Sequence, residues 1–282
     1  MPELPEVETV VRSLAPYLPG RTIVAAEFTS RHVTPGNRAA LARRLAGREI
    51  QSVTRRGKHI LIGLDEGILV VHLGMTGQLL LDPPASNHDH IRGVLRHAYG
   101  VFHLDGGLLI YRDPRQFGSI RLSTHRSDGK THPEDGIKEL AALGPEPLEI
   151  SLEDFTARLK NRKTRIKALL LNQTFVAGIG NIYADEILYA AQVHPLAIAS
   201  RLSKPRVALV HQAMREVLTL AIEHGGSSIS DYVNAAGERG WFQMMHNAYG
   251  REGEPCLRCG APIKRILVAQ RGTHFCAKCQ KR

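Results

Sequence analysis

The chain has 282 residues, of which 43% are hydrophobic, so it is long enough for two domains with cores of their own. Its 37 lysines and arginines outnumber its 27 aspartates and glutamates, and the net charge of +10 fits a nucleic-acid partner as well as it fits a basic protein without one. No apolar run approaches the roughly 20 residues that span a bilayer. The acidic start MPELPEVE has no signal-peptide pattern, so the expected compartment is the cytoplasm.

The first part of the chain predicts two helices and many strands. Residues 5–18 carry apolar side chains at helical spacing, behind a proline that suits a first helical turn. Short β-branched segments between turns follow, as is typical of a sandwich or barrel. The expected strands are TIVAAEF, REIQSVTRR, HILIGL, ILVVHL, GQLLL, GVFHL, LLIYR and SIRLS, and one helix is expected at 38–45.

The pattern changes after GPEPLEI at 144–150, which we expect to be a linker. Helical periodicity then predicts helices at 151–159, 165–173, 181–191 and about 203–224. All four cysteines lie in the last 27 residues. The predicted organisation is therefore a β-rich N-terminal domain, a helical middle and a small C-terminal module.

The cysteines form two C-x-x-C pairs, Cys256 with Cys259 and Cys276 with Cys279, and sixteen residues separate the pairs. A hairpin of that length brings both pairs to one metal ion, which predicts a four-cysteine zinc site. A redox pair or disulfides are the alternatives, and two matched pairs in a short tail argue against both. Four thiolates leave no open position on the metal, so the zinc ion is expected to be structural.

The N-terminus offers a nucleophile. Proline at position 2 is small enough for Met1 to be removed, which exposes a secondary amine. An α-amino group has a pKa of roughly 8, against roughly 10.4 for lysine, so a useful fraction is neutral at neutral pH. Attack on a sugar C1′ gives an iminium that favours strand cleavage by elimination, and Glu3 and Glu6 are close enough in sequence to handle protons. The alternative is that these acids only cap a helix.

The opening MPELPEVETV resembles that of the formamidopyrimidine-DNA glycosylases, bacterial enzymes for 8-oxoguanine and ring-opened purines. The resemblance runs along essentially the whole chain. Its further motifs are GKHI at 57–60, HLGMTG at 72–77, RDPRQFG at 112–118, VAGIGNIYADEILY at 176–189, GERGWFQ from 237, YGREGEPCLRCG at 249–260 and QRGTHFCAKC at 270–279.

This resemblance implies an α+β multidomain fold. We expect a two-layer β-sandwich with flanking helices at 1–143, a helix–two-turn–helix domain at 151–236, and a lesion loop with a zinc-finger β-hairpin at 237–282. The resemblance also implies four catalytic roles. Pro2 is the Schiff-base nucleophile, Glu3 protonates the sugar oxygen, Lys58 serves β-elimination and Arg271 serves δ-elimination. Solvated surface charges are the alternative for Lys58 and Arg271.

Met75, Arg115 and Phe117 match the family residues that fill the duplex when a nucleotide is flipped out. Unstacking costs a few kcal/mol, which inserted apolar side chains offset. An arginine can hydrogen-bond the cytosine whose partner base has been flipped out. Core packing is the alternative for Met75 and Phe117, although both lie at turns. Gln116 stands where many relatives carry a basic residue, so one phosphate contact is expected to be missing.

Further phosphate contacts are expected from the helical domain. Asn181 opens a helix after the turn at 178–180, and a helix start binds phosphate readily. In the basic run RLKNRKTRIK at 158–167 we select Arg162, Lys163 and Lys167. The family also has a His-x-His before the DPRxFG strand. His88-Asp-His90 is one match, but His97 keeps the spacing, with Tyr99 as the second position and an insertion before it.

The prediction is a bifunctional DNA glycosylase and AP lyase for oxidised purines. It would act as a monomer on damaged double-stranded DNA, with one structural Zn²⁺, in the bacterial cytoplasm at the nucleoid. Three alternatives remain. They are an endonuclease VIII-like enzyme for oxidised pyrimidines, a non-catalytic binder of damaged DNA on the same scaffold, and a zinc-ribbon module of a protein complex.

Overall fold

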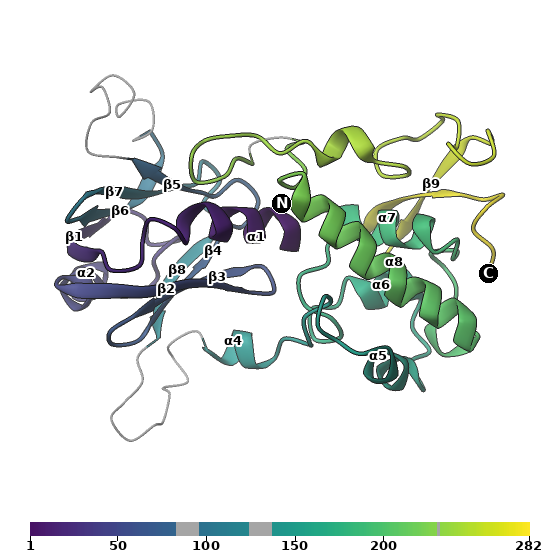
Figure 1. Cartoon of the computed structure of the whole chain (residues 1–282), viewed down its shortest axis with the longest axis horizontal. Helices are drawn as coiled ribbons and strands as arrows, with labels where there is room; N and C mark the ends of the chain where they lie inside the picture. Colours follow the sequence, from purple (N-terminus) through teal and green to yellow (C-terminus); the bar gives the residue numbers. More distant parts are fainter. Residues whose placement is uncertain (83–95, 124–136, 230–231) are drawn as a thin grey trace. The chain divides into compact units, whose positions relative to one another are not determined.

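The computed structural model describes residues 1–82, 96–123, 137–229 and 232–282 (Figure 1). The chain forms two compact units. The first comprises residues 1–142 together with 225–240, and the second comprises 143–224 together with 241–282. Residues 225–240, which follow the long helix, thus belong to the first compact unit, and the predicted domain bounds stay a prediction.

The first unit is built around one antiparallel sheet that folds into two layers. Its elements are α1 (Leu4–Leu14), β1 (Thr22–Phe28), α2 (Arg38–Leu45), β2 (Arg48–Arg56), β3 (His59–Leu64), β4 (Ile68–His72), β5 (Gln78–Asp82), β6 (Ala98–Leu104), β7 (Gly107–Arg112), β8 (Ser119–Ser123) and α4 (Ile137–Ala141). The strand order is β5-β7-β6-β1-β2-β3-β4-β8. Strands β1 and β2 share only a two-residue register, which lets the two halves separate and enclose a core as a β-sandwich.

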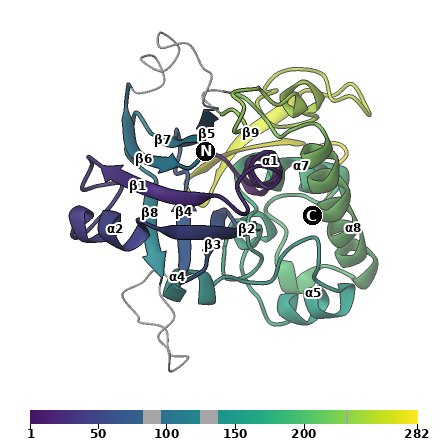
Figure 2. The ribbon, with the colours of Figure 1, turned by 60° about the vertical axis from the view of Figure 1, so that its left-hand side comes forward.

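Helix α1 closes this core, packing against β2 and β3 (Figure 2). Its inward side chains are fully or almost fully buried and lie on one face, namely Val7, Val10, Val11 and Leu14. The helix ends at Leu14, earlier than predicted, because Pro16 and Pro19 follow and prolines cannot continue the hydrogen-bond ladder. All eight predicted strands and the helix at 38–45 are confirmed, with ends shifted by at most two residues.

Residues 225–240 pack on α1. The backbone N–H of Ser227 donates to the Glu6 carboxylate at 2.7 Å, and the Tyr232 hydroxyl donates to the Glu6 carbonyl at 3.1 Å. Ala235 N–H donates to the Ser13 hydroxyl at 3.1 Å. Gly226 has φ +76°, and a Cβ there would lie 2.7 Å from a Glu6 carboxylate oxygen, so this position requires glycine.

The second unit is helical and ends in a hairpin. Its elements are α5 (Leu152–Leu159), α6 (Ile166–Leu170), α7 (Asn181–Ala190), η1 (Ala199–Arg201), α8 (Lys204–Glu223), η2 (Phe242–Met245), β9 (Ile263–Val268) and β10 (Arg271–Cys276). Helices α5 and α7 pack on α8, and β10 packs on α7 (Figure 1). Helix α6 is shorter than predicted, because the Asn172 side chain accepts the Thr174 N–H at 2.9 Å in a turn.

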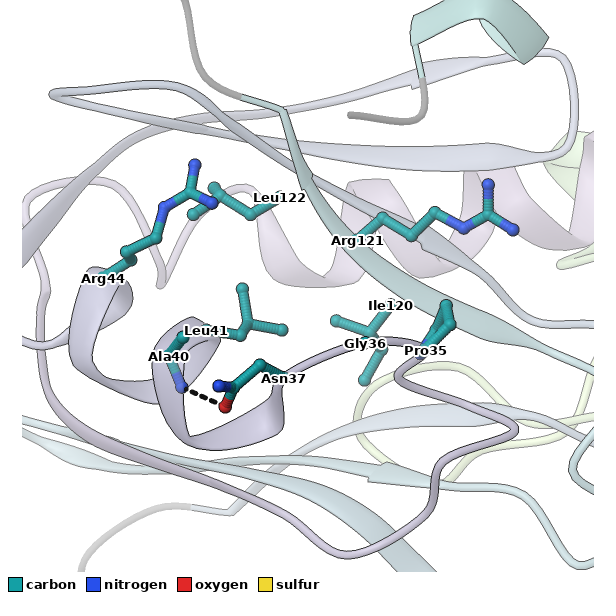
Figure 3. A pocket seen from close by; sticks show the side chains of 9 residues that line it. All are labelled: Pro35, Gly36, Asn37, Ala40, Leu41, Arg44, Ile120, Arg121 and Leu122. Atoms are coloured by element: carbon teal, nitrogen blue, oxygen red, sulfur yellow. Dashed lines mark hydrogen bonds between the residues drawn. The ribbon is translucent and has the colours of Figure 1, made fainter. Parts of the chain in front are cut away.

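A hollow lies on the surface of the first unit. The loop before α2 and strand β8 border a hollow of about 460 Å³, with Arg44 and Arg121 at opposite ends (Figure 3). Asn37 caps α2 there by accepting the Ala40 N–H at 3.0 Å.

Across the described ranges, the helices are all too short or too polar to cross a membrane.

Candidate functional site

The start of the chain is held by a buried carboxylate. Pro2 and Glu3 are both buried directly before α1. One Glu6 oxygen accepts the Glu3 N–H at 2.7 Å, and the other accepts the Ser227 N–H at 2.7 Å. Glu6 was expected to handle protons, but both of its oxygens are engaged in fixing the backbone. Glu6 therefore positions Pro2 and Glu3.

Lys58 lies in the turn between β2 and β3, and a second carboxylate on α1 holds this turn in place. Arg55 bonds the Glu8 carboxylate at 3.0 Å and the Gly57 carbonyl at 3.0 Å. Burial raises the pKa of Glu8, but hydrogen bonds from Arg12 and Arg55 outweigh it and hold that pKa below its ordinary value. Lys58 itself is buried, so it is not the solvated strand-end charge of the alternative interpretation.

Two histidines whose pKa values are lowered by burial accompany Lys58. The rings of His59 and His72 lie 4.9 Å apart. Burial lowers the pKa of His72 to about 4, and the nearby charges of His59 and Lys58 add to this. The neutral Nδ1 of His72 accepts the Gly74 N–H at 3.2 Å, so His72 shapes the turn that carries Met75. The HLGMTG motif contains His72, but sequence reasoning assigned it no role.

Met75, Arg115 and Phe117 lie on two turns that Asp113 joins. The buried Asp113 carboxylate accepts the Thr76 hydroxyl at 2.6 Å and the Gly118 N–H at 2.8 Å. A Cβ on Gly74 would lie 2.5 Å from the backbone of Phe117, so the turns touch backbone to backbone. Asp113 therefore sets the relative position of the two turns.

The trio points outward rather than into the core. Phe117 is 57% exposed and Met75 is 40% exposed. The Arg115 guanidinium lies 4.7 Å from the centre of the Phe117 ring, a cation–π contact. Core packing does not account for two exposed apolar side chains on adjoining turns.

The His97 region is partly described. His97 is half-buried in a positive-φ conformation, and its carbonyl accepts the Asp113 N–H at 3.0 Å. The Gln116 side chain also makes two hydrogen bonds: its amide nitrogen donates to the Tyr99 hydroxyl at 3.2 Å, and its amide oxygen accepts from the Ser30 hydroxyl at 2.6 Å. His88 and His90 lie outside the described residues, so the choice of His97 as a phosphate ligand stays a prediction.

The prediction that Lys167 contacts phosphate is wrong. Its side chain has no exposure, and its ammonium pairs with Asp185 at 2.7 Å. It also donates to the Thr273 hydroxyl at 2.8 Å and the Gly272 carbonyl at 3.2 Å. An ammonium has three N–H groups, so these three acceptors saturate it. Lys167, on α6, instead holds the hairpin of β9 and β10 against α6 and α7.

The same contacts fix Arg271. Asn181 donates to the Gly272 carbonyl at 2.9 Å, next to the Lys167 contact. Ala269 and Gln270 have φ +50° and +59°, typical of a two-residue type I′ hairpin turn. Arg271 follows this turn and is exposed. Asn181 lies in the first turn of α7, after the N-cap residue Gly180, and its phosphate contact stays a prediction.

The other members of the basic run differ in role. Arg158 donates to the carbonyls of Phe175 and Thr174 at 3.1 and 3.0 Å and so secures a loop. Arg162 and Lys163 are exposed on the loop between α5 and α6. That position is compatible with the phosphate contacts predicted for them.

The four cysteines meet in one cluster. All four sulfur atoms lie within 4.8 Å of one another, with Cys256 to Cys279 at 3.9 Å and Cys259 to Cys276 at 3.5 Å. Tetrahedral zinc with Zn–S bonds of about 2.3 Å requires S···S separations near 3.8 Å, so the cluster fits the ion. A zinc ion bound there would supply structural cross-linking of the hairpin.

Replacing Lys167 with methionine should destabilise the second unit by about 3–5 kcal/mol, because the Asp185 carboxylate would stay buried without its partner. Trp241, the single tryptophan, belongs to this unit, so urea unfolding followed by tryptophan fluorescence measures the change. Lys163→Met, an exposed control, should leave the midpoint unchanged. A phosphate-binding Lys167 would give the opposite pattern, with unchanged stability and weakened DNA binding.

Chelating the metal should release one zinc ion per chain and make four thiols reactive. The buried cluster of the hairpin is small, comprising Tyr189, Ala248, Cys256, Ile263 and Cys276, and two of its five members are themselves ligands. The hairpin core is thus too small to persist without the ion. A chromophoric chelator and a thiol reagent read out both numbers. Four thiols reactive before chelation would argue against the zinc site.

Three family models match the chain in order. They are the formamidopyrimidine-DNA glycosylase N-terminal domain over residues 1–120, the formamidopyrimidine-DNA glycosylase H2TH domain over 143–233, and the zinc finger found in FPG and IleRS over 253–282. The chain is 53% identical over 284 residues to the formamidopyrimidine-DNA glycosylase of Solibacter usitatus, with all of both chains covered.

Solved structures agree. The fold is similar to that of a mutant Lactococcus lactis FPG in complex with Fapy-dG containing DNA, with a TM-score of 0.87, 36% identity and complete coverage of both chains. The wild-type Lactococcus lactis protein, in complex with an oxidised pyrimidine containing DNA, gives a TM-score of 0.85 at 36% identity, again over both whole chains. The chain therefore belongs to the formamidopyrimidine-DNA glycosylase family.

Proposed function

We propose that this protein excises formamidopyrimidines and oxidised purines from duplex DNA and then cuts the strand, with the amine of Pro2 as nucleophile. One observation carries the proposal. Buried Glu6 fixes the first residues of the chain and also residues 225–240, so the amine has a defined position. Met1 is 48% exposed and accessible for removal. Pro2 lies directly before the N-cap residue of α1, so the helix start also fixes its backbone.

The chemistry follows from these groups. The Pro2 nitrogen forms a bond to C1′ and loses its proton as the bond from C1′ to the base breaks, and the base leaves with that electron pair and takes up the proton that the amine loses. Glu3 delivers a proton to the sugar ring oxygen as the ring opens, which leaves C1′ and the nitrogen as an iminium. Loss of the acidified C2′ proton then expels the 3′-phosphate. Loss of a C4′ proton, with Arg271 at the phosphate, expels the 5′-phosphate.

The exposed trio holds the duplex open during this chemistry. Met75 and Phe117 insert where the flipped nucleotide has left, and Arg115 bonds the orphaned cytosine. Phosphate contacts come from Lys58, His97 and the loop residues Arg162 and Lys163. Asn181 and the start of α7 add another. The substrate is chromosomal DNA and the relatives are bacterial, which supports a cytoplasmic location at the nucleoid.

The lesion loop is better assigned to the described residues 225–229 and 232–235 than to the segment after 237. Ser227 and Tyr232 bond Glu6 next to Pro2, whereas residues from 241 onward belong to the second unit. Oxidised pyrimidines remain a second substrate class, because the Lactococcus lactis relative was crystallised with such DNA. Duplexes with 8-oxoguanine, a formamidopyrimidine or an oxidised pyrimidine, compared in one cleavage assay, rank the lesions.

Borohydride trapping tests the nucleophile. Mature protein mixed with an 8-oxoguanine duplex and borohydride should give a covalent adduct that peptide mapping places at Pro2. An uncleaved N-terminal extension locks that nitrogen in a peptide bond and should abolish the adduct while DNA binding persists. An equal adduct yield from the extended protein would show that another amine attacks.

Phe117→Ala should weaken binding to a lesion-containing duplex about tenfold, because the unstacked gap loses its filler. The thermal unfolding midpoint should not change, since the ring is 57% exposed. Val24→Ala, at a matched side chain that is 58% exposed on β1, should change neither quantity. Lower stability with unchanged binding would assign Phe117 to packing.

A further inference from the structure

A hollow of about 380 Å³ lies in the second unit, and none of the four cysteines lines it. Four apolar residues and four arginines line it, and we call the apolar residues its floor and the arginines its rim. The floor consists of Leu196, Ala197, Ile198 and Leu202, and the rim consists of Arg165, Arg201, Arg206 and Arg282. We call these eight residues the arginine hollow.

The rim is assembled from four separate segments of the chain. Arg165 precedes α6 and forms an isolated β-bridge with Ile198. Arg201 ends η1, and Arg206 lies in the first turn of α8. The last segment is fixed because Lys281 bridges Val193 and its carbonyl accepts from Arg206. Backbone contacts therefore hold the four arginines around one point.

The charges of this rim are not neutralised. Within the described part of the chain, none of the four guanidiniums forms an ion pair with an aspartate or glutamate, and no acidic side chain lines the hollow. The hollow beside α2 differs, because Arg121 there is paired with Glu139 at 2.8 Å (Figure 3). Four like charges repel one another, so an anionic occupant gains from all four.

The floor decides what kind of anion fits. Leu196, Ile198 and Leu202 are only half-buried, so they present apolar surface to the hollow. A nucleic-acid backbone offers phosphates and sugars, which leave such a floor unfilled. An acidic peptide with one bulky apolar residue satisfies both parts, since its side chain covers the floor and its carboxylates meet the guanidinium forks.

We propose that the arginine hollow docks a short acidic segment of a partner protein, with a large apolar side chain on the floor and carboxylates on the rim. This site is separate from the proposed catalysis, which uses none of the eight residues. It gives the protein a means of recruitment by other proteins that does not occupy Pro2 or the trio.

Fluorescence anisotropy with a labelled hexapeptide tests the proposal on the full-length, zinc-loaded protein. The probe has four aspartates followed by isoleucine and a C-terminal phenylalanine. Binding should saturate and weaken with salt. Arg165→Glu with Arg201→Glu should weaken it at least about tenfold, and replacing the probe's phenylalanine with alanine should weaken it by about tenfold.

Two controls separate the outcomes. Arg38→Glu with Arg43→Glu changes the net charge equally, but on α2 of the first unit, and should leave peptide binding unchanged. The Arg165/Arg201 variant should keep the wild-type unfolding midpoint and borohydride adduct. The proposal is overturned if the peptide does not saturate or if both double variants weaken it alike. It is also overturned if the Arg165/Arg201 variant loses affinity only for undamaged duplex DNA, which would place the hollow on the nucleic-acid surface.

Discussion

Chemistry at the first residue of a chain requires that the chain end be held, because free termini fray and covalent attack needs defined geometry. Glu6 meets this requirement from inside the core. Its two oxygens bond the backbone N–H groups of Glu3 and Ser227, and nearby Gly226 leaves room for that contact. The proposed nucleophile and the segment at 225–240 thus depend on one carboxylate.

In the second unit, a buried ion pair likewise fixes a segment that carries a proposed functional residue. The Lys167–Asp185 pair and Asn181 hold the turn that presents Arg271. A buried ion pair replaces water contacts at a high cost, so its benefit lies in geometry more than in net stability. Phe117 and Arg271, both proposed to meet DNA, are exposed, whereas Asp113 and Lys167, which position their turns, are buried.

The basic run at 158–167 shows how tertiary contacts divide a uniform charge pattern. Arg158 secures a loop and Lys167 holds the hairpin, both through internal hydrogen bonds. Arg162 and Lys163 face solvent, and Arg165 lines the arginine hollow. Side chains of one charge at adjacent positions thus enter three environments, because a turn and a helix start point them in different directions.

The sequence by itself determined the strands, the main helices, the zinc cluster and the family, since alternation, periodicity and C-x-x-C spacing are local properties of the chain. Local pattern could not reveal that Lys167 is buried, that Glu6 reaches Ser227, or that Asp113 joins two turns. The Asp113–Thr76 hydrogen bond joins residues 37 positions apart, and the Glu6–Ser227 hydrogen bond joins residues 221 positions apart. Lys167 is buried although its place in a basic run predicts exposure to solvent. Tertiary structure decided them, because burial and long-range hydrogen bonding are set only when each unit folds.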